Sequence, residues 1–540
     1  MGISVESLDI VMKNGRVVDG CGNPWFYADI GVKDGKIVAI GDLEACDASV
    51  VVEACEKIVS PGFIDMHTHS DAVLLANPTA DSHLCQGITT DVVGNCGISM
   101  TPVSEVAKRQ FDSILGAFNL KWEWSSLKEY LDTLEARGVG VNVLPLIGQG
   151  TLRAAVMGME HRPPNEQELR DMKSHVARQM EAGAFGISTG LFYAPSGYAT
   201  TQELIELAKV VAEYRGIYAS HMRSEGDNLM EAIKETLEIG KKARIPVHIS
   251  HFKACGRTNW GKVKEGFRLI EDARQKGVDV TCDAYPWMAG VTPLSDYPPH
   301  WAVEGGVDKL LERLRNPETR TRIRRDMEQG VPGEESLVKE VGWDRVIVSQ
   351  SPSHVEWEGK TIHELAKSSG EDPYDLAFDL LIEEHGQVMM IEFWGTEDDV
   401  ISVLKHPLTM ISSDSWAIAP TGPLGSGKPH PRFYGNVPRL LGEYVREKGI
   451  IPLEEAVRKM TSFPAQRLAL RDRGQIREGM WADIVVFDSG RVRERGTFAD
   501  PHHFPDGIEW VLVNGVIAIQ EGKATGALAG KALRKTTHFP

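Results

Sequence analysis

The stretch PGFIDMHTHSD, residues 61–71, poses the question that the rest of the chain has to answer. In it a short apolar run ends in His67 and His69, two residues apart. Side chains at positions i and i+2 of a strand point to the same face, so both imidazoles can reach one object. Imidazole is a common ligand of zinc, which makes a metal ion the first candidate. Taken alone, the pattern is more typical of two packed or surface histidines, so partners elsewhere in the chain must decide.

The middle of the chain alternates strand-like and helical segments. One helical stretch is TTQELIELAKVVAEYRG, residues 200–216, where Thr200 and Glu203 predict a capping box and Gly216 a stop. With the strand that ends at His67, the pattern gives about eight strands and predicts an α/β fold, a (β/α)8 TIM-like barrel. The other strand-like runs are GITTDVVGNCG (87–97), VNVLPLIGQG (141–150), AFGISTGLF (184–192), GIYASHMRSE (216–225), IPVHISHFK (245–253), DVTCDAYPW (279–287) and PLTMISSD (407–414).

Both ends of the chain have a different pattern, with short apolar strands around tight turns. Asn14-Gly15, Asp34-Gly35 and Asn514-Gly515 are strong hairpin signals. We therefore predict a small β-sandwich-like domain built from residues 1–60 and 465–540 together. Residues 61–464 form the predicted barrel. A charged helical insertion at about 301–340 follows its seventh strand.

A barrel of this kind carries its functional side chains at the carboxyl ends of its strands. Each alone could be a helix cap or, for the cysteine, an inert buried thiol. Six metal-capable groups at the same end of one barrel favour a metal site, since zinc accepts imidazole, thiolate and carboxylate together. His248 lies inside its strand and is expected to be packed. The predicted ligands are His67, His69, Cys96, His221, His251 and Asp414.

Composition limits the partners and the compartment. The net charge of −17 disfavours nucleic acid or an anionic membrane as a partner. Seven cysteines without a CxxC spacing indicate a reducing compartment and no disulfide framework. We see neither a signal peptide nor a run of about 18 apolar residues, so a cytoplasmic protein is expected. The expected partner is a small-molecule substrate, and the oligomeric state stays open.

The ordered set of HxH, two separated histidines and an aspartate resembles the amidohydrolase superfamily. Cys96 after the second strand, SHFK at 250–253 and HPRFYGN at 430–436 look like its D-aminoacylase, or N-acyl-D-amino-acid deacylase, branch. The resemblance covers nearly the whole chain, including the β domain split between the two ends.

The resemblance implies Zn2+ at two positions that share the thiolate of Cys96. His67, His69, Cys96 and Asp414 would hold one ion, and Cys96, His221 and His251 the tightly bound one. Many superfamily members bridge two metals with a carboxylated lysine after the fourth strand, but GISTGLFYAPSG (186–197) contains no lysine. A bridging thiolate is the consistent substitute, and occupancy of the weaker position stays open.

Zinc lowers the pKa of a bound water to near 7 and polarises a carbonyl, as amide hydrolysis requires. Asp414 is the expected catalytic residue, carrying a proton to the departing amine, and it can also serve as a metal ligand. By the same resemblance the substrate carboxylate would be held by Lys253, Arg432, Tyr193 and Tyr285.

The side chain of the substrate is expected to meet the loop YPWMAGVTPLSDYPPHW, residues 285–301. No arginine occurs in this loop, whereas Trp287, Met288, Leu294 and Trp301 are large and apolar. These residues favour apolar D-amino acids.

The leading hypothesis is thus zinc-dependent hydrolysis of N-acyl-D-amino acids. Two alternatives keep the metal and change the bond, namely a cyclic-amide hydrolase and a D-specific dipeptidase. A third is a non-catalytic scaffold, which should have lost ligands that this chain retains. Handedness, acyl group and metal count are left open by the residues themselves.

Overall fold

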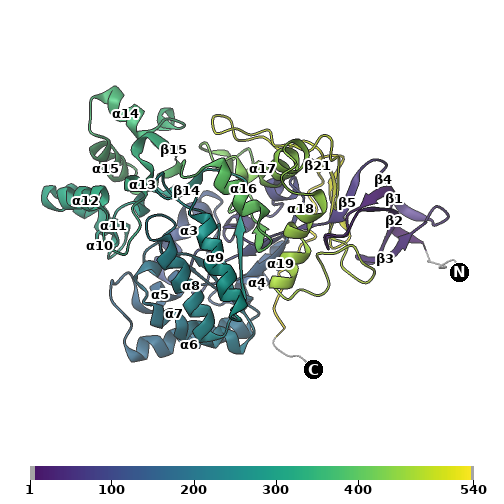
Figure 1. Ribbon diagram of the computed structural model, residues 1–540, viewed down its shortest axis with the longest axis horizontal. Helices are drawn as coiled ribbons and strands as arrows, with labels where there is room; N and C mark the ends of the chain where they lie inside the picture. The colour runs from purple at the N-terminus through teal and green to yellow at the C-terminus, as the bar shows by residue number, and fades with distance from the viewer. Residues whose placement is uncertain (1–6, 537–540) are drawn as a thin grey trace.

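A barrel of parallel strands forms the centre of the molecule (Figure 1). The structure, a computed structural model, describes residues 7–536, with residues 110 and 112–114 described by their backbone alone. Within that range the barrel strands are β6 (Phe63–Asp65), β7 (Ile88–Val93), β8 (Asn142–Pro145) continued by β9 (Ile147–Gly148), β10 (Gly186–Gly190), β11 (Ile217–His221), β12 (Val247–Ile249), β13 (Val280–Ala284) and β17 (Thr409–Ile411).

Two parallel sheets, β6-β7-β8 and β9-β10-β11-β12-β13-β17, together close the barrel. At one seam the amide of Leu146 donates to the carbonyl of Val93 at 2.8 Å. At the other seam the amide of Asp414 donates to the carbonyl of His67 at 2.9 Å. The closed arrangement confirms the predicted (β/α)8 fold, and its second seam already brings two predicted site residues together.

Helices cover the outside of the barrel. Their apolar faces pack on the strands because the connections between parallel strands must return across the sheet surface. The helices before β13 are α1 (Val73–Ala76), α2 (Asp81–Leu84), α3 (Glu105–Ala117), α4 (Leu127–Arg137), α5 (Gln149–Met157), α6 (Glu166–Glu181), α7 (Thr201–Glu213), α8 (Leu229–Ala243) and α9 (Val263–Gln275). Those near and after β17 are α16 (Glu397–Lys405), α17 (Arg432–Arg439), the π-helical η6 (Leu440–Glu447), α18 (Leu453–Met460) and α19 (Ser462–Arg467).

Side chains fill the interior of the barrel toward the amino-terminal end of its strands, so the barrel is a packed core and not a pore. Ile64, Val92, Leu144 and Met410 from four different strands belong to one buried cluster, and Leu468 beyond α19 completes it. The six ligands predicted from the sequence lie at the opposite end, where the strands finish.

The small β domain draws strands from both chain ends into one sheet, of order β21-β20-β19-β18-β5-β1-β2-β3, with β4 paired to β1. Its buried core includes Met12, Val32 and Val59 from the first part of the chain and Ile484 and Leu512 from the last. Its strands are β1 (Leu8–Val17), β2 (Phe26–Lys33), β3 (Lys36–Gly41), β4 (Ala48–Glu53), β5 (Ile58–Pro61), β18 (Ile484–Phe487), β19 (Ile508–Val513), β20 (Val516–Gln520) and β21 (Lys523–Ala524).

Two of the three predicted tight turns connect neighbouring strands, and the third does not. Asp34-Gly35 joins β2 to β3, and Asn514-Gly515 joins β19 to β20. The turn predicted at Asn14-Gly15 is wrong, because β1 runs through it with a bulge in its register against β2. Asn14 has φ 61°, and its amide donates to the Asp29 carboxylate at 2.8 Å. A left-handed residue can make a bulge as well as a turn.

A large segment, residues 285–408, separates β13 from β17. It contains the predicted helical region at 301–340 but extends further in both directions and includes an antiparallel sheet of order β14-β16-β15. The segment lies at one end of the molecule and the small β domain at the other (Figure 1). Its elements before α16 are β14 (Gly290–Pro293), η2 (Leu294–Asp296), α10 (His300–Val303), α11 (Val307–Arg315), α12 (Pro317–Gln329), α13 (Leu337–Val341), η3 (Trp343–Arg345), β15 (Val346–Gln350), η4 (Val355–Trp357), α14 (Ile362–Ser369), α15 (Pro373–Glu383) and β16 (Met389–Glu392).

The last described residues leave the small domain and return to the barrel. The amide of Gly530 donates to Val139 at 2.7 Å, and the amide of Leu533 donates to Val143 at 2.8 Å. In the described part of the chain, no helix combines the length and the apolar character needed to cross a bilayer.

Candidate metal centre

All six predicted ligands lie at the carboxyl end of the barrel. His67 follows β6 by two residues, Cys96 follows β7 by three, and His221 is the last residue of β11. His251 follows β12 by two residues and Asp414 follows β17 by three. Neighbouring parallel strands bring these positions to one edge, which is why residues hundreds of positions apart meet.

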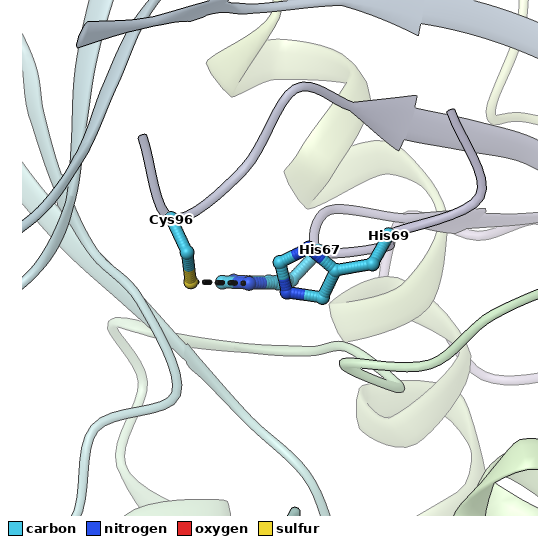
Figure 2. A group of neighbouring side chains, drawn as sticks. All are labelled: His67, His69 and Cys96. Atoms are coloured by element: carbon cyan, nitrogen blue, oxygen red, sulfur yellow. Dashed lines mark hydrogen bonds between the residues drawn. The ribbon is translucent and has the colours of Figure 1, made fainter. Parts of the chain in front are cut away.

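Cys96 lies at the centre of the group. Its Sγ is 3.2 Å from Nε2 of His67, 3.5 Å from Nε2 of His251 and 3.8 Å from Nδ1 of His221. Figure 2 shows Cys96 and His67 pointing at each other, with His69 beside His67 on the same loop. Burial would raise the pKa of the Cys96 thiol, but His67, His221 and His251 hold it well below its usual range. The environment therefore favours a thiolate, the form that binds metal.

Two groups of side chains can each surround one ion, and both contain Cys96. In His67, His69 and Cys96, and again in Cys96, His221 and His251, the ligand atoms lie within 4.8 Å of one another. Nε2 of His67, the nitrogen that faces Sγ of Cys96, also lies 3.6 Å from Oδ1 of Asp414. Thiolate and imidazole are the donors that zinc prefers, so the residues present fit a zinc ion at either position.

Asp414 connects the ligand group to a buried arginine. Its Oδ1 is 3.2 Å from Nε2 of His69, and its Oδ2 is 2.9 Å from Nη2 of Arg432. Burial alone would raise the pKa of Asp414, but Arg432, followed by His69 and His67, holds it well below its usual range. Burial would likewise lower the pKa of His69, which Asp414 and Cys96 raise to about 9. Asp414 is thus kept as a carboxylate that can accept a proton.

Three of the ligand residues have left-handed backbone conformations. Their φ angles are 49° at Cys96, 34° at His251 and 50° at Asp414. Such conformations are costly for residues other than glycine and collect at functional sites. Gly94 supports the loop before Cys96, because a Cβ at this position would meet the carbonyl oxygen of Leu146 at 2.1 Å.

Two carboxylates that our sequence analysis missed orient the histidines. Oε1 of Glu225 is 2.8 Å from Nδ1 of His251, which leaves Nε2 of that ring to face Cys96. Asp283 accepts the amide of His251 at 3.0 Å and lies 2.7 Å from Nε2 of the buried His248. Metal-bound histidines commonly bond a carboxylate through their second nitrogen. Glu225 in HMRSEGD could have been found by asking which acid follows a strand that ends in a ligand.

The predicted carboxylate-binding residues lie beside the ligands but are already partly engaged. Nζ of Lys253 forms an ion pair with Oε2 of Glu225 at 2.6 Å. The ring of Tyr285 lies 5.9 Å from Nζ of Lys253 and 4.6 Å from Cζ of Arg432. Arg432 is 1% exposed, and its Nη1 has no partner among the described residues. Tyr193 packs edge-on against His221, with ring centroids 4.9 Å apart.

A cavity of about 610 Å³ opens over this group. Its wall includes Cys96, His69, His221, His251 and Asp414 and the four predicted carboxylate-binding residues. The large apolar residues expected to contact the substrate side chain are absent from its described lining. Leu294 is in the core, Trp287 packs on His430 and Phe498, Met288 is exposed and Trp301 stacks under Arg322.

The family model described as "Amidohydrolase family" matches residues 50–519. The D-aminoacylase of Alcaligenes xylosoxydans xylosoxydans is 36% identical over 531 residues, which cover 98% of this chain and 98% of the relative. The N-acyl-D-glutamate deacylase of the same organism is 36% identical over 94% of this chain and 93% of its own length.

Solved structures show the same architecture. A crystal structure of N-acyl-D-glutamate deacylase from Bordetella bronchiseptica superposes with a TM-score of 0.82 at 33% identity. The match covers 98% of this chain and all of that one. That enzyme was solved with zinc and a phosphonate inhibitor that mimics the tetrahedral intermediate of its reaction.

Proposed function

We propose that this chain, which belongs to the amidohydrolase family, hydrolyses the amide bond of N-acyl-D-amino acids and uses zinc to do so. Hydrolysis would release a carboxylic acid and a free D-amino acid. The observation that carries the proposal is the cavity, because five of the six predicted ligands share its wall with Lys253 and Arg432. A metal site beside two cations fits a scissile amide next to a free carboxylate.

The carboxylate end of the substrate would bind Arg432. Nη1 of this guanidinium is buried and has no partner, although Nε and Nη2 both donate to the carbonyl of Asp414. A buried cationic donor without an acceptor is costly, and a substrate carboxylate would supply one. Lys253 adds a second positive charge, and its ion pair with Glu225 fixes the position of that charge.

Proton transfer would fall to Asp414. Its carboxylate lies between His69 and Arg432, and the pKa shift described above keeps it ionised. A group in this position can take a proton from the attacking water and deliver it to the departing amine. A zinc ion held by Cys96, His221 and His251 would supply the Lewis acidity that activates the water and polarises the amide carbonyl.

A cyclic-amide hydrolase is the main alternative, and a D-specific dipeptidase the next. A cyclic imide has no free carboxylate to satisfy Arg432, which argues against the first. Other members of the superfamily would carry a carboxylated lysine at the end of β10. In this chain β10 ends at Gly190, which Leu191 follows, so the lysine is missing there. The scaffold alternative requires lost ligands, and this chain retains the complete set.

The test is amine release by zinc-loaded protein from paired N-acetyl-D-methionine and N-acetyl-L-methionine. We expect turnover of the D-form only. If zinc-loaded protein leaves every N-acetyl-D-amino acid intact but opens dihydrouracil, the result would favour the cyclic-amide hydrolase. If it instead cleaves a D-dipeptide, the result would favour the dipeptidase.

We also propose the cytoplasm as the compartment and a small molecule as the partner. All seven cysteines are free thiols, as a reducing compartment would require.

A further inference from the structure

Four carboxyl groups line the cavity without an ion-pair partner among the described residues, and three of them, Asp296, Glu335 and Glu392, come from the segment between β13 and β17 while the fourth, Asp71, follows β6. The two cations of the same wall are already neutralised, Lys253 by Glu225 and Arg432 by Asp414. Neither of these two cations forms an ion pair with Asp296, Glu335 or Glu392.

Glu392 is 5% exposed and meets only neutral donors. Oε1 accepts from the hydroxyl of Thr292 at 3.2 Å, and Oε2 from the hydroxyl of Tyr297 at 3.4 Å. Gly290 leaves room in front of it, since a Cβ there would lie 2.6 Å from Oε1. Asp296 also lines the cavity, at the end of η2, and no described residue donates a hydrogen bond to its carboxylate.

Glu335 also lines the cavity, and Glu340 lies next to Glu335 outside the lining. Oε2 of Glu335 accepts the amide of Glu225 at 3.0 Å. Its Oε1 is buried and unpartnered, and so is Oε2 of Glu340, a residue only 9% exposed. One carboxyl oxygen from each of these two residues and Sγ of Cys255 lie within 4.8 Å of one another. The two buried oxygens without a hydrogen-bond partner are acceptors that a cationic donor would satisfy.

Burial raises the pKa of Asp296, Glu340 and Glu392 to about 7 in each case. It also raises the pKa of Glu335 well above its usual range, with Glu340 as the second cause. Burying carboxylates without cations is unfavourable, and a bound cation would relieve that cost.

We propose that Asp296, Glu335 and Glu392 form the subsite for a cationic substrate side chain, so that the substrates are N-acyl-D-amino acids ending in an ammonium or guanidinium group. N-acyl-D-lysine and N-acyl-D-arginine are the simplest members of this class. The inference rests on the proposed deacylase function and replaces the apolar preference expected from the loop sequence.

The residues that line the cavity suit such a side chain. Its α-carboxylate would bind Arg432, and its methylene stem would pass the apolar residues Val291 and Pro293 of β14, which line the cavity between Gly290 and Asp296. A long side chain with a charged end packs its stem on apolar surface and places the charge among acceptors. An acidic side chain would instead meet three carboxyl groups.

A metal ion is a less suitable occupant of this wall. Burial and the neighbouring Glu335 raise the pKa of Cys255 well above its usual range, so a metal ion here would have to displace the thiol proton to bind. Asp296 and Glu392 also lie outside the group that could hold an ion.

The test compares substrates that differ in charge and little else. N-acetyl-D-arginine and N-acetyl-D-citrulline have the same length and shape, and only the first is cationic. We expect zinc-loaded protein to give a kcat/KM about 10- to 100-fold higher for arginine than for citrulline, the range that hydrogen bonds to charged groups provide. Equal values would overturn the inference.

Variants then locate the subsite. In Glu392→Gln and, separately, Asp296→Asn, we expect the arginine-to-citrulline ratio to fall toward one. Glu312→Gln makes the same chemical change on an exposed face of α11 and should keep the wild-type ratio. Asp296→Asn tests the idea even if Glu392→Gln does not fold. An unchanged ratio in every folded variant would place the selectivity elsewhere and overturn the assignment.

Failure of this inference is distinguishable from failure of the deacylase function. Hydrolysis of N-acetyl-D-methionine or N-acetyl-D-glutamate with none of the cationic substrates would overturn the subsite and leave the function standing. No hydrolysis of any N-acetyl-D-amino acid by protein with zinc confirmed bound would overturn both. An extra equivalent of zinc in the wild type that is lost in Glu335→Gln would assign the wall to a metal and overturn the subsite.

Discussion

Cys96 sits where the two groups of metal ligands meet, and the chemistry of the whole site depends on its thiolate. Three imidazole nitrogens lie within 3.8 Å of its sulfur, so it can contact an ion in either position. With both positions filled, a thiolate in this place would take the bridging role that the resemblance assigns to a carboxylated lysine in other superfamily members.

Replacing Asp414 by alanine should abolish most turnover while the tightly held metal stays bound. Loss of a general acid–base costs about 100- to 10,000-fold in kcat, and the Cys96–His221–His251 group is untouched. Steady-state kinetics together with metal analysis of the purified variant would check this. Asp398→Asn, on the exposed side of α16, is the control. Near-normal kcat in zinc-loaded Asp414→Ala would refute the assignment of proton transfer.

Glu225→Gln should weaken zinc binding. The carboxylate bonds Nδ1 of His251 and neutralises Lys253, and removal of such an outer partner costs about 10- to 100-fold in metal affinity or activity. A zinc titration of chelator-treated protein would measure the change. Glu231→Gln on α8 removes an exposed carboxylate of the same size and should bind zinc as the wild type does. If both variants bind zinc equally well, Glu225 does not orient His251.

Sequence reasoning works best for residues whose chemistry and position repeat a pattern. The six ligand candidates were found because each sits where a strand ends, and the structure brings all of them to one edge. Glu225, Asp283 and the three acids of the proposed cationic subsite were missed. Their roles depend on which side chain they face across the barrel or the insertion, and that information is not local in the sequence.

At the scale of elements, the strand-to-loop connections hold the ligands, and glycines decide how closely those loops approach. Gly94 has φ 80°, and its missing side chain lets the loop before Cys96 pack on Leu146. Few other residues could occupy this position without moving the thiolate.

Gly94→Ala should therefore destabilise the protein and reduce its zinc content. The added methyl group would meet a backbone oxygen, and the left-handed backbone adds strain of about 1–3 kcal/mol. Gly116→Ala is the control, because it lies exposed in α3 with no atom near its missing Cβ, and it should stabilise by about 0.5–1 kcal/mol. Thermal unfolding and metal analysis would compare them. A Gly94→Ala protein with wild-type Tm and zinc content would contradict this account of the loop.

Elements were predictable where local signals agree with tertiary packing and failed where they compete. The N-cap Thr200 accepts from the amide of Glu203, as the capping box requires. The side chain of Glu203 turns away to Arg153 and Gln149, because a buried arginine binds it more strongly than the helix end does. In the insertion, the charged helices were evident, but β14 and β16 are four residues each and too short for a clear pattern.

At the scale of the whole molecule, the barrel supplies the predicted metal ligands and the insertion supplies the acids of the proposed subsite. Asp296, Glu335 and Glu392 all come from residues 285–408, whereas the metal ligands follow the barrel strands. This separation would let the substrate preference change without disturbing the chemistry. It also explains why the resemblance, which rests on the predicted metal ligands, predicts the reaction more directly than it predicts the side chain of the substrate.

The C-terminal segment ties the two chain ends to the barrel. Deletion of residues 527–540 would remove backbone hydrogen bonds to Val139, Val143 and Gly183, and should cost about 2–6 kcal/mol at roughly 0.5–1.5 kcal/mol for each of four bonds. We expect a clear fall in Tm.

A surface change in the same segment provides the control for that deletion. Arg534→Ala removes ion pairs with Asp132 and Glu135 and one local hydrogen bond to the carbonyl of Ala532, and should cost about 0–1 kcal/mol. A truncated protein that unfolds at the wild-type temperature would show that the segment does not stabilise the barrel.

The central claim is that a metal bound around Cys96 makes this chain a deacylase of N-acyl-D-amino acids. Its most direct test is the initial rate of amine release from an N-acetyl-D-amino acid, measured as zinc is added to chelator-treated protein. We predict no release without metal, a rate that rises as zinc binds, and no release from the L-form at any zinc level. Full activity in the metal-free protein, or none in the zinc-bound protein with any N-acetyl-D-amino acid, would contradict the claim.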